Sequence, residues 1–154
     1  MVTHTSETAI RALIHLAAAP TGRPTPPRVI AGAIDCSPTY LAKTVQLLAR
    51  GGILRSRKGA HGGVWLARPP EDITLLTIVE ACQGLVVGNY CQTLRGASPA
   101  VCGFHRAMQE VYDSTVATLS RWTLADLIAQ PAPAGSTTCK MLMAPSHLPR
   151  AAHA

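Results

Sequence analysis

The chain has 154 residues, which is enough for one domain with a hydrophobic core plus a helical extension, and too few for two full-sized domains. Hydrophobic residues make up 47% of the sequence, yet only two Trp, three Tyr and one Phe are aromatic. Ala, Leu, Val and Ile must therefore build the core, which favours helices packed through small side chains. The net charge of +6 excludes an acidic protein and points to polyanions as partners.

Targeting and membrane-spanning segments are not expected. The first twenty residues lack a basic leader, and Glu7, Arg11 and His15 interrupt what would have to be the apolar core of a signal peptide. No stretch of about twenty apolar residues is free of charge. We therefore expect a cytoplasmic protein without a membrane partner, whose five cysteines serve as reduced thiols, metal ligands or redox sensors.

The basic residues are concentrated in one part of the chain. Between Asp35 and Glu71 there is no acidic residue. The same window holds six cations: Lys43, Arg50, Arg55, Arg57, Lys58 and Arg68. Attraction between such a segment and phosphate is strong but unspecific. The window therefore predicts either a nucleic-acid-binding face or a solvated basic face without a partner.

A first helix is predicted over residues 6–19, where apolar side chains recur at helical spacing and Thr5 or Ser6 can cap the start. The proline-rich run that follows must end this helix, because proline lacks the backbone N–H that a helix needs. Pro27 can then begin a short second helix over 27–34, since an N–H at the first helical position would have had no partner.

A third helix follows after one tight connection. Ser37 is placed as its N-cap, Pro38 as its first residue and Gly51-Gly52 as its stop. Two helices joined by so short a turn are typical of a helix-turn-helix.

Two strand-like segments come next, 53–57 and 64–67, around a glycine-rich hairpin tip. A basic hairpin in this place is typical of the wing of a winged-helix domain.

The second half is predicted to be helical. A fourth helix over 74–83 carries Cys82 on its apolar face, where a thiol behaves as a small buried hydrophobe. A long helix over 101–121 has an apolar stripe too long for so small a domain to cover. A second copy would cover the stripe, so we expect a homodimer. A short helix at 122–129 and a disordered tail complete the chain.

The winged-helix pattern predicts contacts with double-stranded DNA. Exposed side chains at the start of a recognition helix reach base edges in the major groove, while the flanking helix and the wing bind phosphates. The residues that we expect at this interface are Arg28, Ser37, Thr39, Tyr40, Lys43, Thr44, Arg55, Arg57, Lys58 and His61. A dimer of such units would read a roughly two-fold symmetric operator.

Cys91, Cys102 and His105 lie where a loop leads into the long helix. Cys102 and His105 are three residues apart on the predicted helix, so their side chains share one face. The loop is long enough to fold Cys91 back towards them. Such a set can hold an iron–sulfur cluster, form a reversible disulfide or, with Glu7, bind zinc. No oxyanion motif or third orienting residue accompanies the Cys–His pair, so we do not expect an enzyme.

Four phrases of the sequence resemble the small bacterial winged-helix repressors that include the iron–sulfur cluster regulator and the nitric-oxide-sensitive repressor. They are "AIRALIHLA", "SPTYLAKTVQLLARGGIL", "RKGAHGGVWLARPPEDITLLTIVEA" and "LADLI", and the resemblance extends to residue 130. It implies a dimeric DNA-binding regulator with crossed long helices and a cofactor loop just before the long helix.

The resemblance also implies a ligand set. Family members that carry a cluster usually place three cysteines in the loop; Cys91 and Cys102 match the first and the last, and the middle one has no counterpart in 94–98. His105 matches a ligating or near-ligating histidine of some members. Glu7 matches an acidic residue that completes the site from the other subunit. The implied cofactor is an iron–sulfur cluster, 2Fe–2S in preference to 4Fe–4S.

We therefore expect a mainly α protein with a small β-hairpin wing, a winged helix-turn-helix followed by a long dimerisation helix. Residues 1–83 would bind DNA, 84–102 form the cofactor or sensor loop, 103–130 pair the subunits, and 131–154 form the tail. The expected function is a transcriptional repressor that senses redox, nitric oxide or iron–sulfur status. The alternatives are a cofactor-free thiol/disulfide regulator on the same fold and a zinc-binding interaction protein that does not bind DNA.

Overall fold

The computed structural model describes residues 2–18, 23–59, 62–86 and 102–130. Their elements are, in chain order, α1 (His4–Ala18), α2 (Pro27–Ala33), α3 (Pro38–Arg50), β1 (Leu54–Arg57), β2 (Gly63–Leu66), the 3-10 helix η1 (Pro70–Asp72), α4 (Leu75–Gln83), α5 (Gly103–Arg121) and α6 (Leu124–Ala129). The predicted mainly helical fold with one hairpin is confirmed. Most of the predicted sensor loop and the predicted tail at 131–154 lie outside the described residues.

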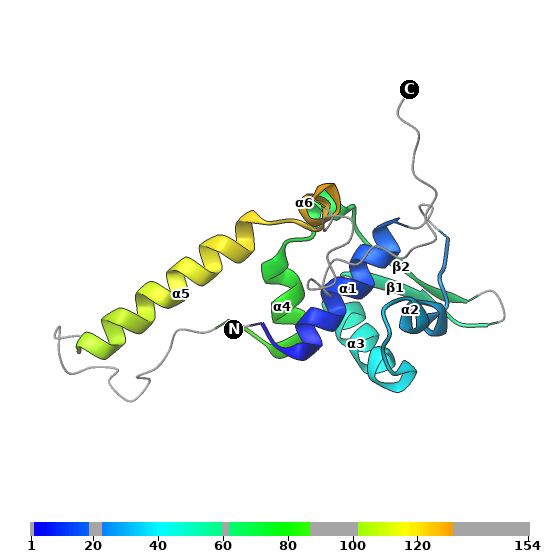
Figure 1. The fold of residues 1–154 in the computed structure, drawn as a ribbon, viewed down its shortest axis with the longest axis horizontal. Coiled ribbons are helices and arrows are strands. Elements are labelled where there is room, and N and C mark those ends of the chain that lie inside the picture. Colours follow the sequence, from blue (N-terminus) through cyan, green and yellow to red (C-terminus); the bar gives the residue numbers. More distant parts are fainter. Residues whose placement is uncertain (1, 19–22, 60–61, 87–101, 131–154) are drawn as a thin grey trace, which may run out of the picture.

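α1 lies among α2, α3, α4, α6 and the hairpin, whereas α5 extends away from them (Figure 1). It packs against α2, α3, α4, α6 and β2. The core contains at least one fully buried aliphatic side chain from each of α1, α2, α3, α4 and α6, including Leu13, Ile30, Leu41, Leu48, Ile78 and Leu124. Ala9 and Ala12 of α1 are completely buried as well, so small side chains allow the close packing that the composition predicts.

The start of α1 differs from the prediction. The helix begins at His4 because the Thr3 hydroxyl accepts the backbone N–H of Ser6 at 3.3 Å, which is the geometry of an N-cap. The expectation that Thr5 or Ser6 caps this helix is therefore wrong. Ser6 is instead fully buried between α1 and α4, a position that no local pattern distinguishes from a cap.

The wing is a two-stranded antiparallel hairpin, with Leu54 opposite Leu66 and Arg57 opposite Gly63. Thr25, just before α2, adds a short bridge beside β2: each backbone N–H of Thr25 and Val64 donates to the other's carbonyl oxygen at 2.9 Å. The two backbones approach so closely that a Cβ on Gly63 would lie 2.7 Å from the Thr25 carbonyl oxygen. The bridge thus fixes the wing to the start of the helix-turn-helix.

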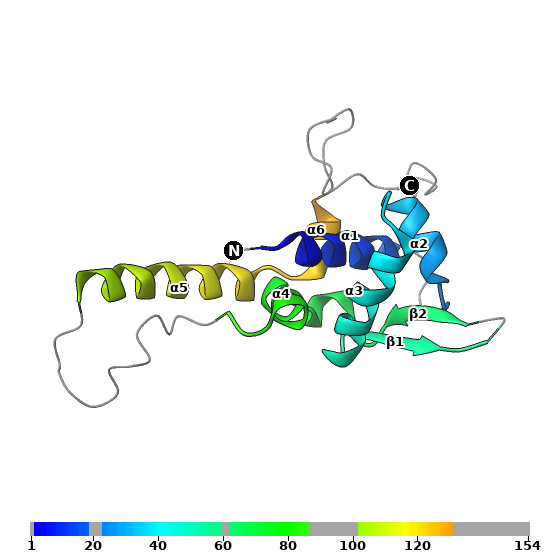
Figure 2. The same ribbon diagram turned by 90° about the horizontal axis from the view of Figure 1, so that it is seen from below.

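The wing and α5 lie at opposite ends of the molecule (Figure 2). α5 packs against α4 along part of its length. Shortly after α5 ends, Thr123 forms a short backbone bridge with Thr74, the residue before α4. The Thr123 hydroxyl accepts the backbone N–H of Asp126, and the Asp126 carboxylate accepts that of Thr123, so a capping box starts α6. The backbone N–H and the hydroxyl of Thr123, which both donate to the Asp126 carboxylate, hold the pKa of Asp126 below its usual value. Among the described helices, none combines the length and hydropathy needed to cross a bilayer.

The close approach at the wing yields a stability test. We expect Gly63→Ala to lower the free energy of unfolding by about 1–3 kcal/mol, because the added methyl group meets the Thr25 backbone rather than a movable side chain. Gly32→Ala is the matched control, since a Cβ there meets no atom within 4 Å. It should be neutral or stabilise α2 by up to about 1 kcal/mol. Urea denaturation measures both, and equal stabilities would contradict the assigned contact.

Candidate nucleic-acid interface and thiol site

The outer face of α3 is the exposed side of the helix-turn-helix. Leu41 and Leu48 turn towards the core, so the opposite side of the helix faces solvent. Thr39, Lys43, Gln46 and Arg50 follow one another on that side at spacings of three or four residues and are all exposed. This row combines hydroxyl, amide and cationic groups, which are the groups that read base edges and bind phosphates.

Most of the residues predicted at the DNA interface are accessible. Those with exposed side chains are Arg28, Ser37, Thr39, Lys43, Arg55, Arg57 and Lys58. His61, at the predicted tip of the wing, lies outside the described residues. The accessible cations come from α2, α3, β1 and the residue that follows β1, so the acid-free window forms part of the surface of the helix-turn-helix and its wing.

Thr44 is not on this surface. It is fully buried, and its hydroxyl donates to the backbone carbonyl of Tyr40 at 3.2 Å. The expectation that Thr44 is exposed is wrong because the residue lies three positions after Leu41 and four before Leu48, on the core side of the helix. Gln46 was missed in its place, although its spacing of three from Lys43 would have identified it.

Tyr40 is only half-exposed, and its hydroxyl is engaged within the chain. The hydroxyl oxygen lies 2.8 Å from Thr5 Oγ1 and 3.1 Å from His4 Nδ1, both on α1. The rings of Tyr40 and His4 also meet, with their centroids 5.5 Å apart. This side chain therefore connects the first turn of α3 to the first turn of α1.

Cys102 occupies the N-cap of α5. Its sulfur accepts the backbone N–H of His105 at 3.4 Å, and the thiol is exposed. Cys91, the other predicted thiol ligand, lies outside the described residues. Glu7 is half-buried on α1. In the described ranges no three His, Cys, Asp or Glu side chains gather closely enough to hold a metal ion, so one chain does not bring Glu7 to Cys102 and His105.

The other two described cysteines have different surroundings. Cys82 packs against the core, and this burial raises the pKa of its thiol to about 11 despite a hydrogen bond with Ser6. The predicted position of Cys82 on the core side of α4 agrees with this packing. Cys36 is half-buried beside the turn between α2 and α3. Cys102 is thus the exposed thiol among the described cysteines.

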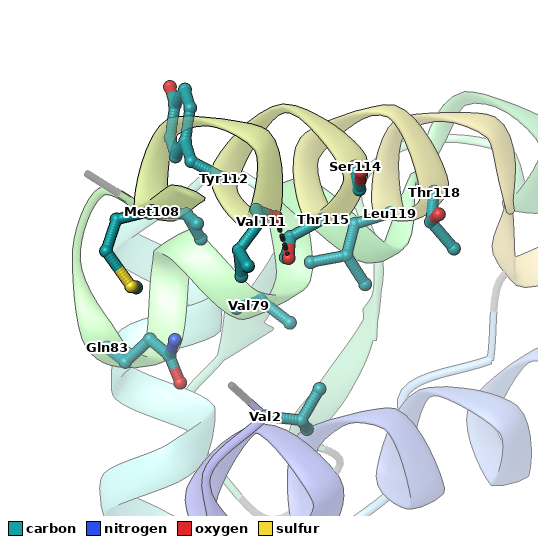
Figure 3. Close-up of a pocket in the computed structure, with 11 residues that line it drawn as sticks. Val2, Val79, Gln83, Met108, Val111, Tyr112, Ser114, Thr115, Thr118 and Leu119 are labelled. Atoms are coloured by element: carbon teal, nitrogen blue, oxygen red, sulfur yellow. Dashed lines mark hydrogen bonds between the residues drawn. The ribbon is translucent and has the colours of Figure 1, made fainter. Parts of the chain in front are cut away.

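A groove runs between α4 and α5, with a volume of about 520 Å³. Figure 3 shows Met108, Val111 and Leu119 of α5 pointing towards Val79 of α4 and Val2 near the N-terminus. None of the 19 residues of α5 is buried by the described part of the chain. Phe104 and Val111 are 64% and 54% exposed. The apolar stripe predicted for the long helix is therefore present: Phe104 and Val111 are exposed, and its other members are half-buried.

These environments predict a difference in thiol reactivity. Because the thiolate is the attacking species, Cys102 should react with iodoacetamide near neutral pH at least about tenfold faster than Cys82, whose raised pKa keeps its thiol protonated. Peptide mass mapping after timed alkylation of the folded, reduced protein measures both rates. In denaturant the two rates should converge. Equal rates in the folded protein would contradict the burial of Cys82.

Comparison with known proteins agrees with this architecture. The family model described as "Rrf2: Iron-dependent Transcriptional regulator" matches residues 2–130. CymR of B. subtilis, described as the global cysteine regulator, is 26% identical with a TM-score of 0.69, and the match covers 84% of this chain and 96% of that chain. IscR of T. potens is 25% identical with a TM-score of 0.69, covering 84% and 86%.

A third structure, the oxidised form of Staphylococcus aureus CymR, is 21% identical with a TM-score of 0.67, covering 86% of this chain and 99% of that chain. At this identity the likeness shows the fold alone. The three structures confirm the predicted winged-helix fold, and the family match confirms the resemblance seen in the sequence. Since the family model matches residues 2–130, which include every described residue, the chain belongs to the Rrf2 family of transcriptional regulators.

Proposed function

We propose that this protein is a homodimeric DNA-binding repressor whose affinity for DNA changes with sulfur chemistry at Cys91 and Cys102. In this proposal residues 1–83 bind DNA, 84–102 sense the signal and 103–130 pair the two copies. Membership of a family of transcriptional regulators supports this role over an enzymatic one.

The exposed polar and basic row on α3 is the observation that carries the proposal. With α3 in the major groove, Lys43 can donate to guanine, and Gln46 can pair with the edge of adenine. Arg55 and Lys58 of the wing would lie against phosphates, where cations add affinity without reading sequence. The bridge between Thr25 and Val64 supports this arrangement, because it fixes the wing to the helix-turn-helix.

The exposed apolar side chains of α5 support pairing with a second copy. A helix of 19 residues is about 28 Å long, and burying a large apolar side chain contributes roughly 1.5–3 kcal/mol. Phe104 and Val111 are more than half exposed in one chain, so a second α5 packed along this face would gain that contribution. A dimer built on α5 would present two DNA-reading units related by a two-fold axis, which suits a symmetric operator.

The start of α5 supports the sensory role. Cys102 is exposed at the positive end of the helix dipole, where anionic ligands are favoured, and His105 follows one turn later. Cys91, Cys102 and His105 of one subunit, together with Glu7 of the partner subunit, would hold an iron–sulfur cluster, 2Fe–2S in preference to 4Fe–4S. When bound, the cluster supplies a centre that responds to oxidants, nitric oxide or iron supply, with a potential that depends on its ligands.

A cofactor-free thiol regulator on the same fold is the second candidate. The exposure of Cys102 favours it, because an accessible thiol can form a reversible disulfide with Cys91. In this version the oxidation of both thiols to a disulfide would change the start of α5 and with it the spacing of the DNA-reading units.

The proposal is tested by measuring DNA affinity in two redox states. Protein purified without oxygen is used to select an operator from a random duplex library, and fluorescence anisotropy then follows binding before and after oxidation. We expect affinity to fall steeply with added salt and to differ by about 5- to 150-fold between the two states, the usual range for coupled sites. Absorbance between about 300 and 500 nm in the oxygen-free protein distinguishes a cluster from a disulfide.

Two variants identify the cysteine that causes the difference in DNA affinity between the redox states. Cys102→Ser should abolish the difference between the states, whereas Cys82→Ala should retain it, because the Cys82 thiol is packed against the core. If the wild-type protein selects no operator in either state, the proposal is contradicted. If Cys102→Ser keeps the full redox difference, DNA binding stands and the sensory assignment is wrong.

A further inference from the structure

The hydroxyl of Tyr40 makes contacts that a DNA-binding side chain would not need. Tyr40 is the third residue of α3, at the end of the helix that would enter the major groove. Its hydroxyl nevertheless lies within hydrogen-bond distance of Thr5 Oγ1 and His4 Nδ1, and its ring packs against the ring of His4. These three contacts join Tyr40 to two residues of α1, Thr5 and His4, which precede it in the sequence by 35 and 36 residues.

The turn of α1 that holds Tyr40 is itself firmly fixed. Ser6, next to Thr5, is completely buried, and its hydroxyl donates to the Gln83 side-chain carbonyl at 3.2 Å. The Thr3 hydroxyl caps the same turn. The first turn of α1 is thus bonded to the last residue of α4, which makes it a stable support for a neighbouring helix.

The turn of the helix-turn-helix, between α2 and α3, is also attached to α1. The Arg11 guanidinium donates to the backbone carbonyl of Ile34, the residue that closes α2. A cation at the C-terminal end of a helix satisfies an otherwise unpaired carbonyl. α1 therefore holds the turn before α3 through Arg11 and the start of α3 through Thr5 and His4.

We propose that Tyr40 is a positioning residue of the recognition helix, which sets the orientation of α3 through its bonds to Thr5 and His4 rather than through contact with DNA. This inference rests on the proposed DNA-binding function. It predicts that DNA affinity depends on Thr5, a residue of α1 outside the proposed interface. A direct contact between Tyr40 and DNA predicts no such dependence.

A double-mutant cycle separates the two roles. Tyr40→Phe removes the hydroxyl and keeps the ring, and Thr5→Val removes its partner at nearly constant volume. We expect Thr5→Val to weaken binding to the selected operator by about 3- to 10-fold, as the loss of one hydrogen bond implies. Tyr40→Phe should weaken binding at least as much, because the Tyr40 hydroxyl contacts both Thr5 and His4. The double variant should bind no more weakly than Tyr40→Phe alone, because the second change removes a bond that is already lost.

Two further variants complete the test. Thr5→Ser restores a hydroxyl and should bind like the wild type. Thr8→Val removes another hydroxyl from α1, one that donates only within the helix to the His4 carbonyl at 2.9 Å, and should also bind like the wild type. Urea denaturation is run on every variant, and binding is measured at a temperature where all of them are folded.

The outcomes are distinct. Normal operator binding by Thr5→Val, or additive losses in the double variant, would overturn the positioning role and assign Tyr40 to DNA contact or to stability alone. A change in the free energy of unfolding without a change in affinity would overturn it as well. If the wild type and Thr8→Val bind no DNA, the proposed function fails, and this result differs from the others.

Discussion

The apolar face of α5 is only partly covered by the described part of its own chain, and the proposed organisation of the molecule depends on that face. The helix has 19 residues, none of them buried, and its side chains line a groove of about 520 Å³ with α4. A face of this kind is stable in water when another surface packs on it. Pairing through α5 would place Cys102 at the base of the shared helix and leave both basic wings accessible.

α1 is the second organising element, because it contacts most of the parts that the proposed switch would connect. Its apolar side chains form the middle of the core. Its first turn bonds to Tyr40 of α3 and to Gln83, the last residue of α4 before the predicted sensor loop. The end of α4 is therefore connected by a single hydrogen bond, between Gln83 and Ser6, to the turn of α1 that contacts α3.

The sequence predicts the elements well and the contacts between them poorly. Helical spacing, prolines and glycines are local signals, and they place the helices and the hairpin within a few residues. The Thr25 bridge to Val64 and the Tyr40 bond to Thr5 join residues that are far apart in sequence, so no local pattern indicates them. The same reasoning explains the wrong cap of α1, since the burial of Ser6 depends on α4.

The candidate site likewise has features that local sequence predicts and features that depend on distant contacts. The cations of the wing and the exposed face of α3 follow from charge and helical spacing. The burial of Thr44 follows from the same spacing, because Thr44 lies on the side of α3 that carries Leu41 and Leu48. The position of Cys102 at the start of α5 is also local and was foreseen. Whether Glu7 approaches Cys102 depends on a second chain, which lies beyond any pattern within one sequence.

Sedimentation velocity of the wild type, Val111→Asp and Ser120→Asp tests the central claim most directly. Val111 lines the groove on the apolar face of α5, whereas Ser120 is exposed on the opposite side of the same helix. The wild type and Ser120→Asp should sediment with twice the mass of one chain, and Val111→Asp should sediment as a monomer, because a buried unpaired charge is costly. A monomeric wild type, or a Val111→Asp variant that dimerises as tightly as the Ser120→Asp control, would contradict the account.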